Sequence, residues 1–360
     1  NVAFVVGARP NFMKVAPLIA EIGRRADCGI RPFLVHTGQH YDAVMSDSVI
    51  RDLGMPEPKE FLGVGGGTHG RQTARIMEGF EEVCERRRPD AIVVVGDVNS
   101  TLACALVGAK MRIPVAHVEA GLRSYDRDMP EEVNRVVTDQ IADLLLTPSE
   151  DAEANLLREG VPSSRIRFVG NLMIDSLLLA LARVRNETAP FAARAKEAGL
   201  PYVAVTLHRP GNVDDLQDLL PILDGLDRVA RDCAVVFPVH PRTAARLEAA
   251  GRRSAGEGPA EGRLTPAIHL VPPMSYLPFV LLLRDATLVL TDSGGVQEET
   301  TVLGVPCATL RPNTERPVTI DVGTNEIVAR APEAIEEAAR RALAGSWKKG
   351  GVPRYWDGAS

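Results

Sequence analysis

The stretch from Thr287 to Leu310, TLVLTDSGGVQEETTVLGVPCATL, limits the possible fold of this chain more than any other. An apolar run, Leu288 to Leu290, ends at the turn Asp-Ser-Gly-Gly, and the residues from Val296 to Leu303 read as a helix. A second buried strand is predicted from Val305 to Leu310. The sequence therefore predicts one βαβ unit, in which a helix begins at the end of a strand.

The start of this predicted helix favours an anion, because free backbone N–H groups and the positive end of the helix dipole meet there. Gly294 and Gly295 let the backbone come close, and the Ser293 hydroxyl adds a donor. Glu298 and Glu299 lie one turn further on, where they can address a neutral group such as a ribose. Taken alone, a glycine turn with a solvated acidic face explains the stretch equally well, so the rest of the chain decides.

Short apolar segments alternate with helical stretches nearly all along the chain, which is typical of parallel sheets with helices on both faces. Further strands are predicted at Val2–Val6, Phe33–His36, Ala91–Val95, Val115–Val118, Leu144–Leu146, Tyr202–Leu207, Ala234–Val239 and Ile268–Val271. Helices are predicted at Phe12–Arg24, Gln72–Arg86, from Met129 onward and at Pro332–Ala344. The predicted fold class is α/β.

With 360 residues and 45% hydrophobic content, the chain can form two domains with full cores. The pattern restarts after Gly170, so we expect domains at residues 1–170 and 171–345 and a tail at 346–360. The segment from Ala249 to Leu264 is small, charged and glycine-rich, and we expect a mobile surface loop there.

Composition excludes several classes of function. A net charge of −6 with mixed signs and no basic stripe argues against nucleic-acid binding. No apolar run approaches the roughly 20 residues of a membrane span, and the chain starts with a strand rather than a signal peptide. The five cysteines form no CxxC pair and look like core residues in a reducing compartment. We expect a cytoplasmic protein without nucleic-acid or membrane partners.

Polar residues follow closely on the carboxyl ends of the predicted strands, the edge at which open α/β sheets bind ligands. So many titratable groups in the same kind of position are difficult to explain by solvation, and they predict one shared active site. The residues are Asp97, Glu119, His208, His240, Ser293 and Arg311.

Some of these polar residues also have structural interpretations. Asp97 is suited to capping the helix that starts near Ser100, and Glu131 to the N-terminus of the helix in MPEEVNR. For each residue alone, capping is as good an interpretation as catalysis. His208 followed by Arg209 is harder to explain structurally, because a structural pair is rarely so polar.

Signals for other sites fail on inspection. GGGTHG, Gly65 to Gly70, fits GxGxxG, but the strand before it is short and the acid about 20 residues on, Glu85, lies in a predicted helix. No tyrosine has a lysine four residues later, so the Tyr-x-x-x-Lys pair of nicotinamide-dependent sugar epimerases is missing. His36 and His40 lie in a strand exit, and no HExxH occurs. We expect neither NAD nor a metal.

A set of specific motifs runs in one order from Gly7 to Asn325. They are GARPNFMKVAPL, HTGQHYD, GDVNSTLA, PVAHVEAGLRS, MPEEVNR, TLHRPGN, TDSGGVQEE, LGVPC and RPNTERP followed by GTN. Together they resemble the non-hydrolysing UDP-N-acetylglucosamine 2-epimerase family, and they cover most of the chain. HVEAGLR, the Ser-Gly-Gly-x-Gln-Glu-Glu run and TERP are the most specific.

This resemblance implies a GT-B-like architecture, with two Rossmann-like doubly wound domains facing a central cleft and a C-terminal segment that crosses back to the first domain. It also implies a homodimer that epimerises a UDP-N-acetylhexosamine at C2 with no cofactor and no essential metal. By position, the resemblance assigns catalysis to Asp97, Glu119, Glu131 and His208. It assigns UDP binding to Arg9, Lys14, Phe279, Ser293, Gly294, Gly295, Glu299 and Arg316.

The chemistry of such a reaction fits these residue types. The C2 proton is not flanked by a carbonyl, so simple deprotonation is not accessible. Breaking the C1–O bond to UDP while removing H-2 gives a 2-acetamidoglucal, and UDP re-adds as a proton arrives on the opposite face. That reaction needs acid and base groups on both faces, hence several carboxylates, and cations that stabilise UDP.

A few positions depart from the family pattern. Pro210-Gly211-Asn212 stands where many relatives carry Arg-Glu-Asn, and Val318 where glutamate is common. An allosteric substrate site of some bacterial members is matched by Gln39, Arg71, Arg209 and His240. Asp42 and Arg242 do not match that site, so allosteric activation stays open, as does the group at the 6-position of the sugar.

Two other functions share part of this pattern. A GT-B glycosyltransferase has a similar UDP cleft but no use for several carboxylates in the sugar half, and sugar transfer to an added acceptor would favour it. A non-catalytic UDP-sugar sensor would tolerate Glu119→Gln and Asp97→Asn. The presence of all four catalytic-type residues argues against both.

Overall fold

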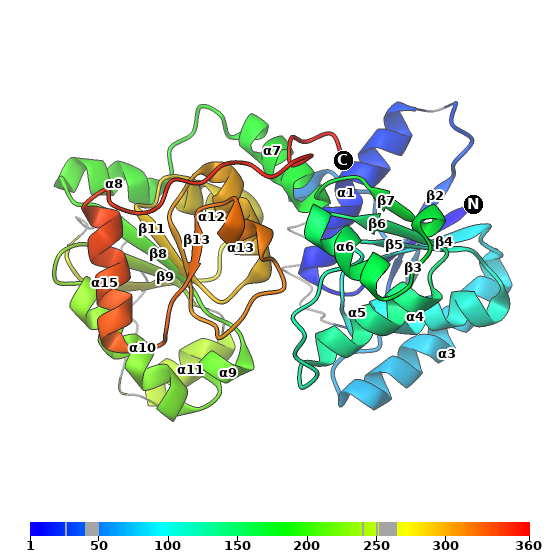
Figure 1. Cartoon of the computed structure of the whole chain (residues 1–360), viewed down its shortest axis with the longest axis horizontal. Coiled ribbons are helices and arrows are strands. Elements are labelled where there is room, and N and C mark those ends of the chain that lie inside the picture. Colours follow the sequence, from blue (N-terminus) through cyan, green and yellow to red (C-terminus); the bar gives the residue numbers. More distant parts are fainter. Residues whose placement is uncertain (26, 40–49, 240, 250, 252–264) are drawn as a thin grey trace. The chain divides into compact units, whose positions relative to one another are not determined.

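The computed structural model describes the chain except residues 26, 40–49, 240, 250 and 252–264. The chain divides into two compact units (Figure 1). Unit 1 comprises Asn1–Leu179 and Arg354–Ser360, and unit 2 comprises Ala180–Pro353. His240, Asp42 and most of the predicted loop from Ala249 to Leu264 lie outside the described residues.

Unit 1 is built on a seven-stranded parallel sheet in the order β3-β2-β1-β4-β5-β6-β7. Its elements are β1 (Val2–Val6), α1 (Arg9–Arg24), β2 (Pro32–His36), β3 (Glu60–Phe61), α3 (His69–Arg87), β4 (Ala91–Val95), α4 (Asn99–Met111), β5 (Val115–Val118), α5 (Pro130–Ile141), β6 (Leu144–Thr147), α6 (Glu150–Arg158), the 3-10 turn η1 (Ser163–Arg165), β7 (Ile166–Phe168) and α7 (Leu172–Arg183), which continues into unit 2.

Unit 2 has a six-stranded parallel sheet in the order β10-β9-β8-β11-β12-β13, the Rossmann order 3-2-1-4-5-6. Its elements are α8 (Pro190–Ala198), β8 (Tyr202–Thr206), α9 (Pro210–Val213), α10 (Leu216–Val229), β9 (Ala234–Pro238), α11 (Pro241–Ala249), β10 (Ile268–Val271), α12 (Tyr276–Arg284), β11 (Leu288–Thr291), α13 (Gly294–Leu303), β12 (Cys307–Thr309), α14 (Val318–Asp321), β13 (Asn325–Ile327) and α15 (Pro332–Leu343). The predicted fold class, with two Rossmann-like parallel sheets, is confirmed.

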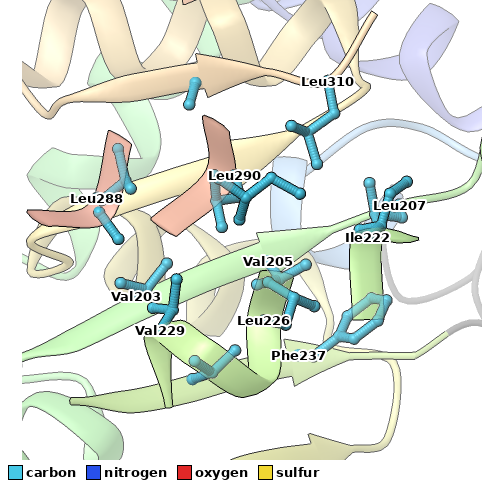
Figure 2. Packing of buried hydrophobic residues seen from close by; sticks show 14 of the residues in the cluster. Val203, Val205, Leu207, Ile222, Leu226, Val229, Phe237, Leu288, Leu290 and Leu310 are labelled. Atoms are coloured by element: carbon cyan, nitrogen blue, oxygen red, sulfur yellow. The ribbon is translucent and has the colours of Figure 1, made fainter. Parts of the chain in front are cut away.

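Strands β8, β9 and β11 of unit 2 are buried on both faces, which explains their largely apolar sequence. Val203 and Val205 of β8 belong to one hydrophobic cluster, whereas Tyr202 and Ala204 belong to another. Successive side chains of a strand point to opposite faces, so the two clusters lie on opposite sides of the sheet. Figure 2 shows side chains of the β8 segment packing against α10 through Val203, Val205, Leu207, Ile222, Leu226 and Val229.

Several element boundaries differ from the predicted ones, and two of them have a clear local reason. Helix α1 begins at Arg9 rather than Phe12, because Pro10 has the backbone angle of a first helical turn. Strand β12 is shorter than the predicted Val305–Leu310. Gly304 ends α13 in the left-handed conformation, with φ 70°, and the N–H of Val305 donates back to the carbonyl of Thr300.

The boundary between the units lies within α7, whereas the prediction placed it after Gly170. The first part of α7 belongs to unit 1, where the Ser176 hydroxyl donates to the carbonyl of Met13. The C-terminal segment also serves both units. Trp347 Nε1 donates to the Thr324 carbonyl of unit 2 at 2.7 Å, and Trp356 Nε1 donates to the Pro148 carbonyl of unit 1 at 2.9 Å. Among the described residues, no helix has the length and apolar character needed to cross a membrane.

Candidate active site

The order of strands reverses between β1 and β4 in unit 1 and between β8 and β11 in unit 2. The crevice beyond the carboxyl ends of the strands at such a point is the usual ligand site of an open α/β sheet. Arg9 and Asp97 follow the two strands of unit 1, and His208 and Ser293 follow those of unit 2. Each unit therefore brings predicted site residues to its own reversal point.

Glu119 directly follows β5 and pairs with Lys14 of α1. Both side chains are buried, and the backbone of Glu119 is left-handed, with φ 69°. Such a backbone is uncommon for a residue with a side chain and is often found at functional sites. A Cβ on Gly96 would lie 3.1 Å from Lys14 Nζ and 3.7 Å from Glu119 Oε2, so a glycine suits this position. Lys14, predicted to bind UDP, thus contacts a predicted catalytic carboxylate.

Asp97 follows β4, and its carboxylate accepts a hydrogen bond from Arg135 Nη2 at 2.5 Å. Arg135 lies on α5 and also pairs with Glu132, one turn earlier in the same helix. The Asp97 side chain is 29% exposed, whereas that of Arg135 is 3% exposed. A buried guanidinium therefore holds a carboxylate that solvent can reach. The capping interpretation of Asp97 is not observed, because the N-cap residue of α4 is Val98.

Glu131 and Arg9 lie at helix N-termini and are partly exposed. Glu131 is in the first turn of α5, where the helix dipole favours a carboxylate. Within the described part of the chain, the Glu131 side chain has no hydrogen bond or ion pair. It is therefore open to a ligand, whereas Asp97 and Glu119 are each paired with a cation.

A buried network begins at His117, two residues before Glu119. His117 Nδ1 lies 2.7 Å from Asp139 Oδ1, and Nε2 lies 2.8 Å from the carbonyl oxygen of Gly96. Asp139 also accepts from Arg123 Nη1 at 2.7 Å. Burial opposes ionisation of Asp139, but the contacts from His117 and Arg123 hold its pKa below its usual value. The network ties the turn after β4 to the strand that precedes Glu119.

In unit 2, His208 lies beside Asp292, the residue that follows β11. His208 Nδ1 is 3.0 Å from Asp292 Oδ1, and the backbone N–H groups of His208 and Arg209 donate to the same carboxylate. Burial opposes ionisation of Asp292, but these contacts and one from Asn212 hold its pKa below the ordinary value. The His208 side chain is 54% exposed and that of Asp292 fully buried. Asp292 orients the imidazole and leaves Nε2 available.

Three arginines surround the buried carboxylate of Glu315. Its oxygens lie 3.4 Å from Arg209, 2.8 Å from Arg311 and 2.5 Å from Arg316, and Arg316 also pairs with Glu298 at 2.8 Å. Burial opposes ionisation of Glu315, but the three guanidiniums hold its pKa well below the usual range. Nη1 of Arg311 is buried and has no hydrogen-bond partner among the described residues. The cluster therefore retains an unsatisfied positive group.

The N-terminus of α13 lies next to this cluster. Ser293 is the N-cap residue, and Gly294 and Gly295 open the helix. A Cβ on Gly294 would overlap the side chain of Arg316, so only glycine fits there. Free N–H groups and a guanidinium thus come together where an anion is favoured.

Two further residues predicted to bind UDP lie on α13 and α12. Glu299 is buried on α13 and accepts a hydrogen bond from the Tyr276 hydroxyl at 3.0 Å. Phe279 of α12 is partly buried against a hydrophobic cluster of unit 2. Both therefore have a packing or hydrogen-bonding role in unit 2 itself.

Comparison with known proteins identifies this arrangement of residues. A family model described as UDP-N-acetylglucosamine 2-epimerase matches residues 24–360. The chain belongs to that family. The UDP-N-acetylglucosamine 2-epimerase of Methanocaldococcus jannaschii is 41% identical over 342 residues, 94% of this chain and 91% of the relative. The UDP-2,3-diacetamido-2,3-dideoxy-D-glucuronate 2-epimerase of Pseudomonas aeruginosa is 39% identical over the same shares.

Solved structures agree with this family membership. The crystal structure of the Methanocaldococcus jannaschii 2-epimerase in complex with UDP-GlcNAc and UDP has a TM-score of 0.86 at 38% identity and covers 99% of this chain and 97% of its own. MurG of Acinetobacter baumannii, at 12% identity and a TM-score of 0.52, shares the fold alone. The prediction of a 2-epimerase family member, and of an enzyme, is confirmed.

The residues matched to an allosteric site of the epimerase family are divided between the two units. Gln39 and Arg71 are in unit 1 and Arg209 is in unit 2, while His240 lies outside the described residues. The side-chain oxygen of Gln39 accepts from the N–H and hydroxyl of Ser100, at 2.9 and 2.7 Å, so Gln39 secures the start of α4. Arg71 is exposed. No group of three or more metal-ligating side chains is placed to hold a metal in the part of the chain that the structure describes.

Several side chains that contact the predicted site residues or their neighbours escaped prediction, because each is recognised only by its contact with another side chain. The sequence offered one signal, the three-residue spacing of Glu132 and Arg135 in MPEEVNR, which predicts an ion pair on one helix face. Nothing in the sequence alone pairs residues from different elements. Those found only in the structure are Arg135, Glu132, Asp139, Asp292 and Glu315.

Proposed function

We propose that the protein catalyses the reversible epimerisation of UDP-N-acetylglucosamine to UDP-N-acetylmannosamine at C2, through elimination of UDP and its re-addition. The observation that carries the proposal is the pair of carboxylates Asp97 and Glu119 at one sheet edge, each contacted by a buried cation, in a chain of this family. The ion pairs favour the ionised form, which a base needs.

The elimination step balances as follows. A carboxylate removes H-2, the C1–C2 double bond forms, and the electron pair of the C1–O bond leaves with UDP. The product is a 2-acetamidoglucal, and the reverse addition with a proton delivered to the opposite face of C2 gives the epimer. Asp97, Glu119 and the unpaired Glu131 supply the acid and base groups that the two faces require.

Unit 2 is proposed to bind UDP as leaving group and nucleophile. The α13 N-terminus at Ser293, the buried N–H of Arg311 without a partner, and Arg316 would stabilise the diphosphate. His208, oriented by Asp292, would stabilise charge at the departing oxygen. Arg9, Phe279 and Glu299 keep the roles that the resemblance gives them. We further propose that the enzyme acts as a homodimer in the cytoplasm, with the dimer tested by light scattering.

The substrate of the Pseudomonas aeruginosa relative carries a second acetamido group and a carboxylate at the 6-position. At 39% identity against 41% for the Methanocaldococcus jannaschii relative, overall similarity does not separate the two substrate classes. UDP-2,3-diacetamido-2,3-dideoxy-D-glucuronate is therefore the second substrate to test.

The test is incubation with UDP-N-acetylglucosamine in heavy water without added cofactor, followed by proton NMR. A manno-configured UDP-sugar with deuterium at C2 in both epimers is expected. Net release of UDP with free N-acetylmannosamine would instead indicate a hydrolysing enzyme. If H-2 is retained in both UDP-sugars, the proposal is wrong. Sugar transfer to an added acceptor would point to a glycosyltransferase.

A further inference from the structure

We infer that Arg135, fixed by Glu132, is the positioning residue that sets the orientation of the Asp97 carboxylate. The inference rests on the proposed function, in which Asp97 takes part in proton transfer at C2. It concerns the polar residues of MPEEVNR that follow Glu131. These residues line the buried face of α5, where Glu132 and Arg135 lie one turn apart.

Glu132 is closed to any substrate. It is 1% exposed, and its two oxygens accept from the Ser124 N–H at 2.9 Å, the Ser124 hydroxyl at 3.0 Å, the Tyr125 N–H at 2.9 Å and Arg135 Nη1. Burial opposes ionisation, but the Ser124 N–H and the Arg135 charge hold its pKa below the ordinary value. Glu132 is thus an ionised anchor rather than an acid or base.

Arg135 connects Glu132 to Asp97 through two hydrogen bonds. Its Nη1 donates to Glu132 and its Nη2 donates to Asp97 Oδ2 at 2.5 Å. The guanidinium is planar and rigid, so fixing one nitrogen sets the direction of the other. With 3% of its side chain exposed, Arg135 is too buried to contact a substrate. An effect of Arg135 on catalysis therefore passes through a side chain that it contacts, and Asp97 is the predicted catalytic residue among these.

The backbone of Asp97 is held from the same helix. Asn134 Nδ2 donates to the Asp97 carbonyl at 2.8 Å and to Asn99 Oδ1 at 3.1 Å. Adjacent residues of α5 therefore fix both the main chain and the carboxylate of Asp97. A partly exposed aspartate without these contacts would occupy several rotamers. Displacing a reacting group by about 1 Å can cost about 100-fold in rate.

Three variants test the inference: Arg135→Lys, which keeps the charge but not the two-pronged geometry, Arg135→Ala, and Glu132→Gln. Gln140→Ala, on the exposed side of the same helix, is the matched control. We expect Arg135→Ala to lower kcat about 100-fold and Arg135→Lys and Glu132→Gln about 10-fold, with KM and the Kd of UDP within about threefold of wild type. Added guanidinium ion at tens of millimolar is expected to restore part of the activity of Arg135→Ala but not of Glu132→Gln.

Wild-type exchange of H-2 for deuterium in the same assay tests the proposed function separately. If the wild type exchanges and both Arg135→Lys and Glu132→Gln keep more than about half of its kcat, the positioning role is refuted. Equal losses of kcat and UDP affinity, without guanidinium rescue, would show a purely structural role. If Arg135→Ala does not fold, Arg135→Lys and Glu132→Gln test the positioning role instead. A fall in kcat with little change in KM supports that role, whereas equal effects on kcat and KM contradict it.

Discussion

The two units use the same kind of sheet edge with opposite arrangements of charge. In unit 1 a buried cation presents a carboxylate: the Arg135 side chain is 3% exposed and that of Asp97 29%. In unit 2 a buried carboxylate presents a basic side chain: the Asp292 side chain is fully buried and that of His208 54% exposed. Glu315, 2% exposed, holds Arg209, 27% exposed, in the same way.

The difference shows how one scaffold can serve two chemical tasks. A buried partner holds the outer group in one orientation, and the chemistry of the outer group decides what it can bind. Carboxylates at the edge of unit 1 suit proton transfer, whereas cations at the edge of unit 2 suit a diphosphate. In both units, a buried side chain (the inner group) holds a more exposed side chain (the outer group) in place. The sequence motifs do not reveal this pairing.

The largest expected effect comes from neutralising the two carboxylates at the sheet edge of unit 1. Asp97→Asn and Glu119→Gln preserve shape but remove a base, so each is expected to lower kcat about 1,000-fold. For Asp97→Asn, the Kd of UDP, measured by calorimetry, should stay within about threefold of wild type, because the proposed UDP-binding cations of unit 2 are untouched. A loss of UDP affinity in the same variant would contradict the proposed assignment of proton transfer to unit 1 and UDP binding to unit 2.

Glu315→Gln tests the inner group of unit 2. Three arginines would lose their shared carboxylate, and the unfolding free energy should fall by about 3 kcal/mol, since a buried charge is left unpaired. The measurement is urea unfolding. Glu326→Gln is the matched control, because Glu326 pairs with Arg341 near the surface of the same unit and should contribute under about 1 kcal/mol.

The same variant, Glu315→Gln, can be compared with wild type in the presence of UDP. If the arginines face the diphosphate, the ligand supplies the missing negative charge, and the rise in Tm on adding UDP should be larger for Glu315→Gln than for wild type. Equal rises in the two proteins would mean that the cluster is structural only.

Asp139→Asn tests the inner network of unit 1 through its pH dependence. The pKa of Asp139 is depressed in the folded state, so its contribution is present above the unfolded pKa, about 3.9, and is lost as the pH falls through the folded value. We expect Asp139→Asn to reduce the unfolding free energy by about 2 kcal/mol at pH 7. Urea unfolding below pH 4 should show a smaller difference; a difference that is constant with pH would contradict the ion-pair account.

The fold could be predicted because its signals are local. Each strand is a short apolar run ended by polar or glycine residues, and β8, β9 and β11 lie where expected since both of their faces are buried. The errors are local as well. The start of β12 was placed too early, because the left-handed Gly304 and the turn that follows it depend on hydrogen bonds that the apolar pattern does not encode.

The outer residues of the candidate site were predictable from their place after strands, and the inner ones were not. Asp97 and His208 stand at strand ends in recognisable motifs. Arg135 contacts Asp97 across 38 residues, and Asp292 contacts His208 across 84 residues, so their pairing exists only once the sheets are assembled. The burial of the inner residues could not be predicted either. An aspartate that follows a strand looks the same in the sequence whether its side chain is buried or exposed to solvent.

The smallest effect concerns the C-terminal segment, which carries one anchor for each unit. Trp347→Phe and Trp356→Phe keep an aromatic ring but remove the Nε1 hydrogen bonds to the carbonyls of Thr324 and Pro148. Each should lower the unfolding free energy by about 1 kcal/mol.

Because the chain has two tryptophans, each single variant leaves one fluorophore, in unit 1 for Trp347→Phe and in unit 2 for Trp356→Phe. Fluorescence-detected urea unfolding of the two variants then follows each unit separately. UDP is expected to raise the midpoint reported by Trp347 more than that reported by Trp356, because the proposed diphosphate-binding cations belong to unit 2. A larger rise at Trp356 would reverse the assignment of tasks to the two sheet edges.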